Sequence, residues 1–384
     1  MFDNIKEKTA PNTSVGADVG QLNHKNNTII IPELDENFND FEKDFEEMQR
    51  EMFLQMNPSY LKTISMTELF STVYRTKQPI IDGLLNAGTY IFAGAPKLGK
   101  SFFMAQLAYH ISTGTPLWNY KIKKSTVLYL ALEDDYNRLQ SRLYRMFGAT
   151  SNENLHFSVS AGQLGQGLDE QLTGFMERNP DTKLIIIDTL QKIREADGDK
   201  LSYANDYKLI ARLKKFTDNY GICLLLVHHT RKQSADDKFD MISGTNGLLG
   251  ASDGAFLLQK EKRTGNSAVL EISGRDQQDQ KLYLKRNTET LLWELEKAEI
   301  ELWNEPIEPL IEDVLNLFKE DFTSWEGSPT ELVELLNLEI KPNILTYKLN
   351  VNASKLLQKF NIMYENKRTH NGRKIKLELQ RDDA

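Results

Sequence analysis

The stretch from Gly94 to Ser101, GAPKLGKS, has the residue types and the spacing of a phosphate-binding loop. It follows the apolar run TYIFA and precedes FFMAQLAYHI, which has helical periodicity, so a strand should enter the loop and a helix should leave it. Gly94 and Gly99 permit a tight turn whose backbone N–H groups point at a phosphate, next to the positive end of the helix. The alternative is a glycine-rich strand-to-helix turn that holds no ligand.

The residues of this loop have distinct expected roles. Lys100 would reach the β- and γ-phosphates of a nucleotide, and Ser101 would give its hydroxyl to Mg²⁺. We therefore expect ATP and Mg²⁺ as cofactors. The residues expected to hold the nucleotide are Gly94, Ala95, Pro96, Lys97, Leu98, Gly99, Lys100, Ser101 and Phe102.

Three acids end the next apolar run, STVLYLALEDD, which predicts a buried strand. Ligands of open α/β sheets bind at the carboxyl ends of the strands, so a carboxylate there should lie beside the phosphate loop. We expect Glu133 to be the general base that orients the attacking water. Asp134 and Asp135 fit the N-cap and first turn of the following helix, which is also the alternative for the whole trio.

Two further predicted strands also end in polar side chains. KLIIIDTLQKI places Asp188 at a strand tip, where it would accept from a water on Mg²⁺ or from Ser101; a helix N-cap is the alternative. GICLLLVHHTRK ends in His228 and His229, whose side chains should point to opposite faces of the strand. One of them could sense the γ-phosphate, and a structural histidine is the alternative. Cys223 fits a small core residue.

Length and composition limit the class of protein. A chain of 384 residues can hold one full α/β domain and a smaller one. No apolar run approaches the roughly 20 residues that span a bilayer, and the N-terminus lacks the features of a signal peptide, so we expect a cytoplasmic protein without a membrane partner. The net charge of −8 disfavours a uniformly basic nucleic-acid binder.

Charge and periodicity divide the chain into three parts. Residues 1–60 should be partly disordered and contain an acidic amphipathic helix that either docks on the main domain or binds a partner. Residues 61–300 alternate strands and helices up to about Trp293, which predicts an α/β domain with a mostly parallel twisted sheet. Residues 301–384 are basic towards the end and should form a separate small domain.

The motifs GAPKLGKS, VLYLALEDD, LIIIDTL, LLLVHHTRK and GTNGLLGASDGAFLL occur in the order found in the RepA-like branch of the RecA/DnaB superfamily of hexameric ATPases, which this chain resembles over roughly Thr63 to Trp293. The resemblance implies a RecA-like core in a homo-hexamer, with Glu133 as catalytic glutamate and Asp188 as Walker B aspartate. It also implies that His229, with His228 as the runner-up, couples the γ-phosphate to DNA. A basic residue in trans would be Arg275, with Arg263 and Lys285 as weaker candidates.

In this superfamily, loops after two of the strands contact single-stranded DNA in the centre of the ring. The corresponding segments here are Gln191 to Asp206 and Lys232 to Gly247, which are polar and too long for tight turns. They also carry many acids, so binding should be modest and sensitive to salt. The cations expected to meet phosphates include Lys192, Arg194 and Lys232.

The last segment has its own pattern of three short helices and a hairpin. PLIEDVLNLFKED, SPTELVELLNL and NASKLLQKFNI read as helices, and Asn371-Gly372 predicts the turn of a hairpin. This order resembles a winged-helix domain that binds duplex DNA; a protein-binding winged helix is the alternative. The expected DNA contacts are Lys348, Lys355, Lys359, Lys367, Arg368, Arg373 and Lys374.

Together these features predict an ATP-dependent DNA helicase that acts in the replication of a plasmid, a phage or an integrative element. The first alternative is a DNA-dependent ATPase that loads or recruits other proteins without unwinding. The second is a KaiC-like nucleotide switch whose output is binding of a protein partner. A replication initiator or a primase would be a further partner of the helicase.

Overall fold

The computed structural model describes residues 50, 52–54, 56–74, 77–194, 203–231, 238–242, 246–261, 265–275, 277–300, 308–319, 323–369 and 372–380. The chain divides into two compact units, Met1–Met66 and Thr67–Ala384, and each is described by itself. Of the predicted acidic helix only Arg50 falls within the described residues, so that helix and the disordered N-terminus stay predictions. The predicted domain boundaries stay predictions as well.

Within the described residues, nine strands form one sheet in the order β3-β2-β4-β5-β1-β6-β7-β8-β9. The pairs from β3 to β6 are parallel, which confirms the predicted mostly parallel sheet. The pairs from β6 to β9 are antiparallel, because the short connections between them leave no room for a crossover helix. The strands are β1 (Gly88–Gly94), β2 (Thr126–Ala131), β3 (Leu155–Ser158), β4 (Thr182–Asp188), β5 (Cys223–His229), β6 (Gly254–Lys260), β7 (Ser267–Gly274), β8 (Gln277–Arg286) and β9 (Trp293–Ile300).

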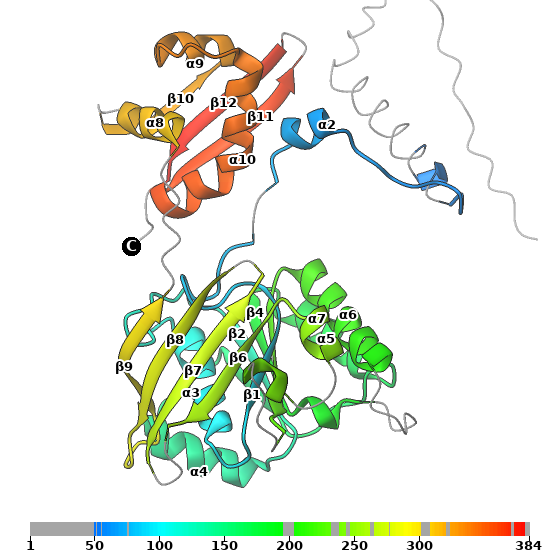
Figure 1. Ribbon diagram of the computed structural model, residues 1–384, viewed down its shortest axis with the longest axis vertical. Coiled ribbons are helices and arrows are strands. Elements are labelled where there is room, and N and C mark those ends of the chain that lie inside the picture. The colour runs from blue at the N-terminus through cyan, green and yellow to red at the C-terminus, as the bar shows by residue number, and fades with distance from the viewer. Residues whose placement is uncertain are drawn as a thin grey trace, which may run out of the picture. The chain divides into compact units, whose positions relative to one another are not determined.

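Helices cover both faces of the parallel part of the sheet (Figure 1). One face carries α3 (Lys100–Thr113) and α4 (Tyr136–Phe147). The other carries α5 (Leu168–Arg178), α6 (Tyr203–Tyr220) and α7 (Asn246–Ala251). Strands covered on both faces must be apolar throughout, which explains why β1, β2 and β4 read as continuous apolar runs instead of alternating ones.

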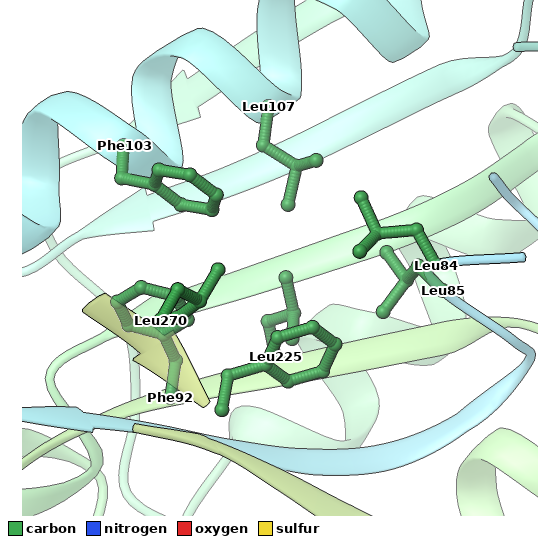
Figure 2. Close-up of a pocket in the computed structure, with 8 residues that line it drawn as sticks. Leu84, Leu85, Phe92, Phe103, Leu107, Leu225 and Leu270 are labelled. Carbon is green, nitrogen blue, oxygen red and sulfur yellow. The ribbon is translucent and has the colours of Figure 1, made fainter. Parts of the chain in front are cut away.

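Large apolar side chains fill the space between α3 and the sheet (Figure 2). Phe103 and Leu107 of α3 point towards Phe92 of β1, Leu225 of β5 and Leu270 of β7, and the cavity between them measures only about 10 Å³. The rings of Phe92 and Phe103 stack with centroids 5.3 Å apart. Truncating such a core phenylalanine to alanine costs about 3–5 kcal/mol. This packing holds the first turns of α3, and with them the preceding loop, against the sheet.

A second, smaller core lies near the C-terminus. Its antiparallel sheet has the order β10-β12-β11, and Ser328 caps α9 by accepting from the backbone N–H of Glu331. The predicted helices and hairpin are present, but the third helix begins ten residues earlier than expected, with Pro342 in its first turn. The elements are α8 (Pro309–Lys319), β10 (Ser324–Gly327), α9 (Pro329–Leu335), α10 (Pro342–Phe360), β11 (Ile362–Thr369) and β12 (Gly372–Leu379).

The helix α2 (Met66–Ser71) and the segment that follows it contact this smaller core. The Asn350 Nδ2 atom of α10 donates to the Phe70 carbonyl over 2.8 Å, and Val73 packs against the apolar cluster. The buried Asn350 Oδ1 accepts from Tyr364 and Asn366 of β11. One asparagine thus links the chain ahead of the main domain with the C-terminal helix and hairpin. No helix among the described residues has the length and apolar character needed to cross a membrane.

Candidate nucleotide-binding site

The loop from Gly94 to Ser101 joins the end of β1 to the start of α3, as its flanks predict. Gly99 adopts φ of 104°, a left-handed conformation that favours glycine. At Gly94 a Cβ atom would lie 2.8 Å from the backbone oxygen of Leu258, so no side chain fits there. The two glycines are therefore required by the backbone path of the loop.

Lys100 is buried at the centre of the site. Its Nζ atom donates to the carbonyl oxygens of Gly94 at 2.8 Å and Ala95 at 3.1 Å, and lies 3.2 Å from Nδ1 of His229. Burial lowers the pKa of Lys100, and the nearby carboxylates of Asp188 and Glu133 oppose this shift. The ammonium group is thus held over the loop by carbonyl groups that a phosphate could replace as its partner.

Asp188 lies at the end of β4, beside Ser101. Its Oδ2 atom accepts from the Ser101 hydroxyl at 2.7 Å and from the Tyr129 hydroxyl at 2.9 Å. Burial raises the pKa of the Asp188 carboxyl, and these two hydrogen bonds counteract the rise. A hydroxyl and a carboxylate side by side are the hard oxygen donors that Mg²⁺ takes, so the residues present fit this ion.

Tyr129 is a member of the site that sequence reasoning missed. It lies in β2, and its ring is fully buried in the core while its hydroxyl reaches Asp188. Burial and the Asp188 carboxylate raise the pKa of the Tyr129 phenol well above its usual value, which keeps it a donor. The sequence does contain a signal for this role: a tyrosine stands in an apolar predicted strand, and a buried phenol needs a polar partner.

The three acids after β2 have separate roles. Asp135 caps α4 by accepting from the backbone N–H of Arg138 over 2.9 Å, and Asp134 pairs with Arg142 at 2.6 Å. Glu133 is exposed, and its Oε1 atom accepts from the Thr189 hydroxyl at 3.2 Å, next to Asp188. Glu133 is therefore the acid of the trio that faces the site, and its role as base stays a prediction.

The structure distinguishes the two histidines of β5. His229 lies beside Lys100, and burial together with that cation lowers its pKa, which favours the neutral ring. His228 is buried, and strand alternation directs its side chain to the opposite face. The geometry thus favours His229 over His228 as the residue near the phosphates.

Arg286 is a second residue that sequence reasoning missed. It ends β8, and its Nη1 atom lies 2.9 Å from the position that a Cβ on Gly99 would take. Its guanidinium lies 5.7 Å from the ring centroid of Phe102 and 5.8 Å from that of Trp293, whose indole contacts the Gly99 carbonyl at 3.4 Å. The end of β8 therefore brings a cation against the phosphate loop of the same chain. The antiparallel meander, which the sequence did not predict, is what places it there.

Arg275 lies elsewhere. It follows β7, whose last residue Gly274 is paired with Gly254 at the start of β6, so Arg275 is at the sheet edge opposite the phosphate loop. Its Nη2 atom donates to the Gly250 carbonyl over 2.7 Å. Arg275 takes no part in the site of its own chain, and its predicted role towards a neighbouring chain stays a prediction. Arg263 lies outside the described residues, and Lys285 is 3.9 Å from Glu296.

The predicted single-strand contacts are described only in part. Lys192 is exposed at the end of the 3-10 helix η1 (Leu190–Lys192), whereas Arg194 forms an ion pair of 3.0 Å with the buried Asp206. Lys232 and about half of each predicted loop, residues 195–202, 232–237 and 243–245, lie outside the described residues. The first loop is shorter than predicted, because α6 already begins at Tyr203, and the 3-10 helix η2 (Lys238–Met241) interrupts the second.

The basic residues of the C-terminal part lie on α10 and on the hairpin. Several are paired: Lys348 with Glu308, Lys367 with Glu365 at 2.8 Å, and Lys374 with Glu326 at 2.7 Å. Arg368 is exposed near the tip of β11 and lies directly across from Arg373 of β12. Lys355 and Lys359 lie in the second half of α10.

Comparison with known proteins gives one family match and a set of distant structures. Residues 56–235 match the AAA domain family. One solved structure, described as an ATPase domain, is similar at 14% identity and a TM-score of 0.48, over 67% of this chain and 97% of that one. A DnaB-like replicative helicase, described with its interactions with primase, is similar at 15% identity and a TM-score of 0.49, over 67% and 75%. No curated protein matches the chain. The AAA domain match spans Lys100, Glu133, Asp188 and His229.

Proposed function

We propose that this chain is an ATP-dependent DNA helicase of the RecA/DnaB type, RepA-like, which serves the replication of a plasmid, a phage or an integrative element. The observation that carries the proposal is the convergence of Lys100, Ser101, Asp188 and His229 at the phosphate loop, with Glu133 beside them. The AAA domain match over residues 56–235 supports ATP as the nucleotide.

Each residue of the site has a separate role in the proposed hydrolysis of ATP. Backbone N–H groups of the loop and Lys100 bind the β- and γ-phosphates, and Ser101 and Asp188 would hold Mg²⁺, which when bound adds positive charge beside the phosphate oxygens. Glu133 orients a water towards the γ-phosphorus and takes its proton, while the bond to the bridging oxygen breaks and ADP leaves. Arg286, against Gly99, adds a further positive charge to the bound nucleotide.

A ring of identical chains, which we take to be a hexamer, is part of the proposal. Arg275 lies at the edge opposite the phosphate loop of its own chain, so it would act on the nucleotide of a neighbouring chain. A guanidinium supplied in trans stabilises the charge of the phosphoryl-transfer transition state. His229 contacts Lys100 and precedes the segment from Lys232 to Gly247, which would link the γ-phosphate to single-stranded DNA in the ring.

The C-terminal part serves in this proposal as a winged-helix domain that holds duplex DNA. The hairpin opposes like charges, Lys367 against Lys374 and Arg368 against Arg373. Such cross-strand pairs are unfavourable unless counter-charges are near. Glu365 and Glu326 compensate the lysines, whereas no acid is paired with either arginine among the described residues. DNA phosphates would fill this role.

A nucleotide switch that binds a protein is the second candidate, and one observation favours it. Lys348, Lys367 and Lys374 already have acidic partners, so their charge is less available to DNA than their number suggests. In that case the C-terminal part would dock an initiator or a primase. A loader that hydrolyses ATP on DNA without unwinding it would use the same site.

Strand displacement on forked DNA tests the helicase. The purified full chain should separate a labelled strand in the presence of ATP, and Lys100→Ala should abolish both displacement and ATP hydrolysis. Lys183→Ala is the matched control, because this exposed lysine lies at the start of β4, at the end away from the site. ATP hydrolysis that DNA stimulates without displacement would favour the loader, and hydrolysis that ignores DNA would favour the switch.

A further inference from the structure

Two exposed tyrosines stand at the start of α6. Tyr203 and Tyr207 are one helical turn apart, and their rings are nearly parallel, with centroids 6.1 Å apart and an angle of 21° between the planes. Tyr203 is 55% exposed and Tyr207 44%. Each ring therefore offers apolar surface to a ligand outside the protein.

Buried residues fix the helical turn that carries these rings. Asp206, between the two tyrosines, is buried and bound to Arg194 at 3.0 Å. Ile210, one turn further, is fully buried in the core. A Cβ on Gly250 of α7 would lie 3.6 Å from the Tyr203 hydroxyl, so α7 borders the pair. The rings are thus mounted on a fixed helix instead of a loose loop.

Among the described residues, the exposed charge next to the rings is positive. Lys208 directly follows Tyr207 and has no acidic partner among the residues that the structure describes, while Asp206 is neutralised by Arg194. Arg275 reaches the Gly250 carbonyl on the neighbouring α7. Aromatic rings combined with cations match a ligand with flat faces and negative charge, which is the chemistry of a nucleic-acid strand with unstacked bases.

We infer that Tyr203 and Tyr207 bind single-stranded DNA by stacking on its bases, next to the predicted channel loop that precedes α6. The inference rests on the proposed function and deepens it, because the cations of that loop account only for contacts to phosphates. Stacking accepts any base, which suits a motor that moves along arbitrary sequence. The predicted site consists of Tyr203, Tyr207 and Lys208.

Fluorescence anisotropy with a fluorescein-labelled oligo-dT tests the site in the full chain. Stacking on one ring contributes about 1–3 kcal/mol, which is roughly a 5- to 150-fold change in Kd. Tyr203→Ala and Tyr207→Ala should each weaken binding at least fivefold, while Tyr207→Phe should retain it because the ring is kept. Tyr144→Ala, a similarly exposed tyrosine of α4 on the other face of the sheet, is the matched control.

An oligonucleotide with abasic sites separates stacking from other effects. Wild type should bind it more weakly than oligo-dT, and the double variant Tyr203→Ala/Tyr207→Ala should no longer distinguish the two. The salt dependence of binding should not change in the double variant, because no phosphate contact is lost, whereas Lys208→Ala should reduce the slope by about 0.7.

Three outcomes would overturn the inference, and they differ in whether they also contradict the proposed function. Equal affinity of wild type and double variant for oligo-dT would refute the stacking site alone. Loss of assembly in the double variant, measured by light scattering, would make the tyrosines a contact between copies of the chain. Wild type that hydrolyses ATP but binds no single-stranded DNA would refute the DNA motor as well. Unchanged ATP hydrolysis without DNA verifies that each variant is folded.

Discussion

At the scale of residues, the site depends on how the charges around one buried lysine are balanced. Lys100 is surrounded by two carboxylates and a histidine, and Asp188 is satisfied by hydroxyl donors instead of by a cation. Because the two groups are not paired with each other, the Lys100 ammonium group can bind a phosphate while the Asp188 carboxylate can bind a metal ion. Glu133 stands outside this pair, held by Thr189.

Glu133→Gln tests the predicted base. The amide keeps the size of the side chain and its contact with Thr189 but cannot take a proton from water. We expect ATP binding to persist while turnover falls on the order of 10² or more, the usual contribution of general-base catalysis. Filter binding and steady-state phosphate release measure the two quantities, and Glu153→Gln, an exposed carboxylate ahead of β3, is the control. Loss of ATP binding would show that Glu133 has a structural role.

Arg286→Ala tests the cation that the fold brings to the phosphate loop. A lost charge-assisted hydrogen bond costs about 1.5–3 kcal/mol, so the KM for ATP should rise tenfold or more. Lys285→Ala removes the same charge one residue away, where the side chain points towards Glu296, and should leave the KM unchanged. The reverse result would restore Lys285 as the candidate.

Most of the candidate site could be predicted because each residue sits at a strand end whose strand is visible as an apolar run. Asp188 and His229 follow this rule, and the register of parallel strands brings their ends to the edge where the loop after β1 leads to Lys100. Tyr129 and Arg286 could not be found this way. Both positions depend on tertiary packing. The Tyr129 phenol reaches Asp188 from the neighbouring strand β2, and the antiparallel strands β7 and β8 bring Arg286 to the loop.

At the scale of elements, the hairpin of β11 and β12 offers a direct test of DNA binding, because like charges on its two strands lie opposite each other. Replacing both Arg368 and Arg373 with alanine should weaken binding to duplex DNA and lower the salt slope by about 0.9 for each lost phosphate contact. The same variant should be no less stable, since an unfavourable like-charge pair is removed. Titration of a labelled duplex at several salt concentrations checks this. An unchanged slope would favour a protein partner.

The hydrogen bond between α10 and α2 provides a second test at this scale. Asn350→Ala would leave the Phe70 carbonyl and the Tyr364 hydroxyl without their partner, at a cost of about 1–3 kcal/mol for such buried groups. Asn343→Ala, at an exposed position of the same helix, should be close to neutral. Urea unfolding monitors the loss of stability. The sequence could not show this contact, since its partners are 280 residues apart.

At the scale of the whole molecule, the proposed ring predicts that one chain is not a complete enzyme, because Arg275 would act on the nucleotide of a neighbouring chain. Arg275→Ala should lower turnover by about 10³ with little change in ATP affinity, as loss of a trans-acting guanidinium does. Mixing this variant with Lys100→Ala chains should restore part of the activity, because some interfaces then combine an intact loop with an intact arginine. Mixtures that assemble but stay inactive would exclude Arg275 from the role.

The contact between Phe70 and Asn350 also bears on the order of events during synthesis. Phe70 and Val73 leave the ribosome before the main domain, whereas α10 and β11 leave it after the main domain. Domains tend to fold as units while the chain emerges. The sheet around β1 can therefore form before the side chains of Phe70 and Val73 have contacted Tyr347 of α10 and the apolar cluster of the smaller core. The smaller core can therefore be completed only after α10 and the hairpin of β11 and β12 are made, and a chain interrupted before them would expose Phe70 and Val73 to chaperones.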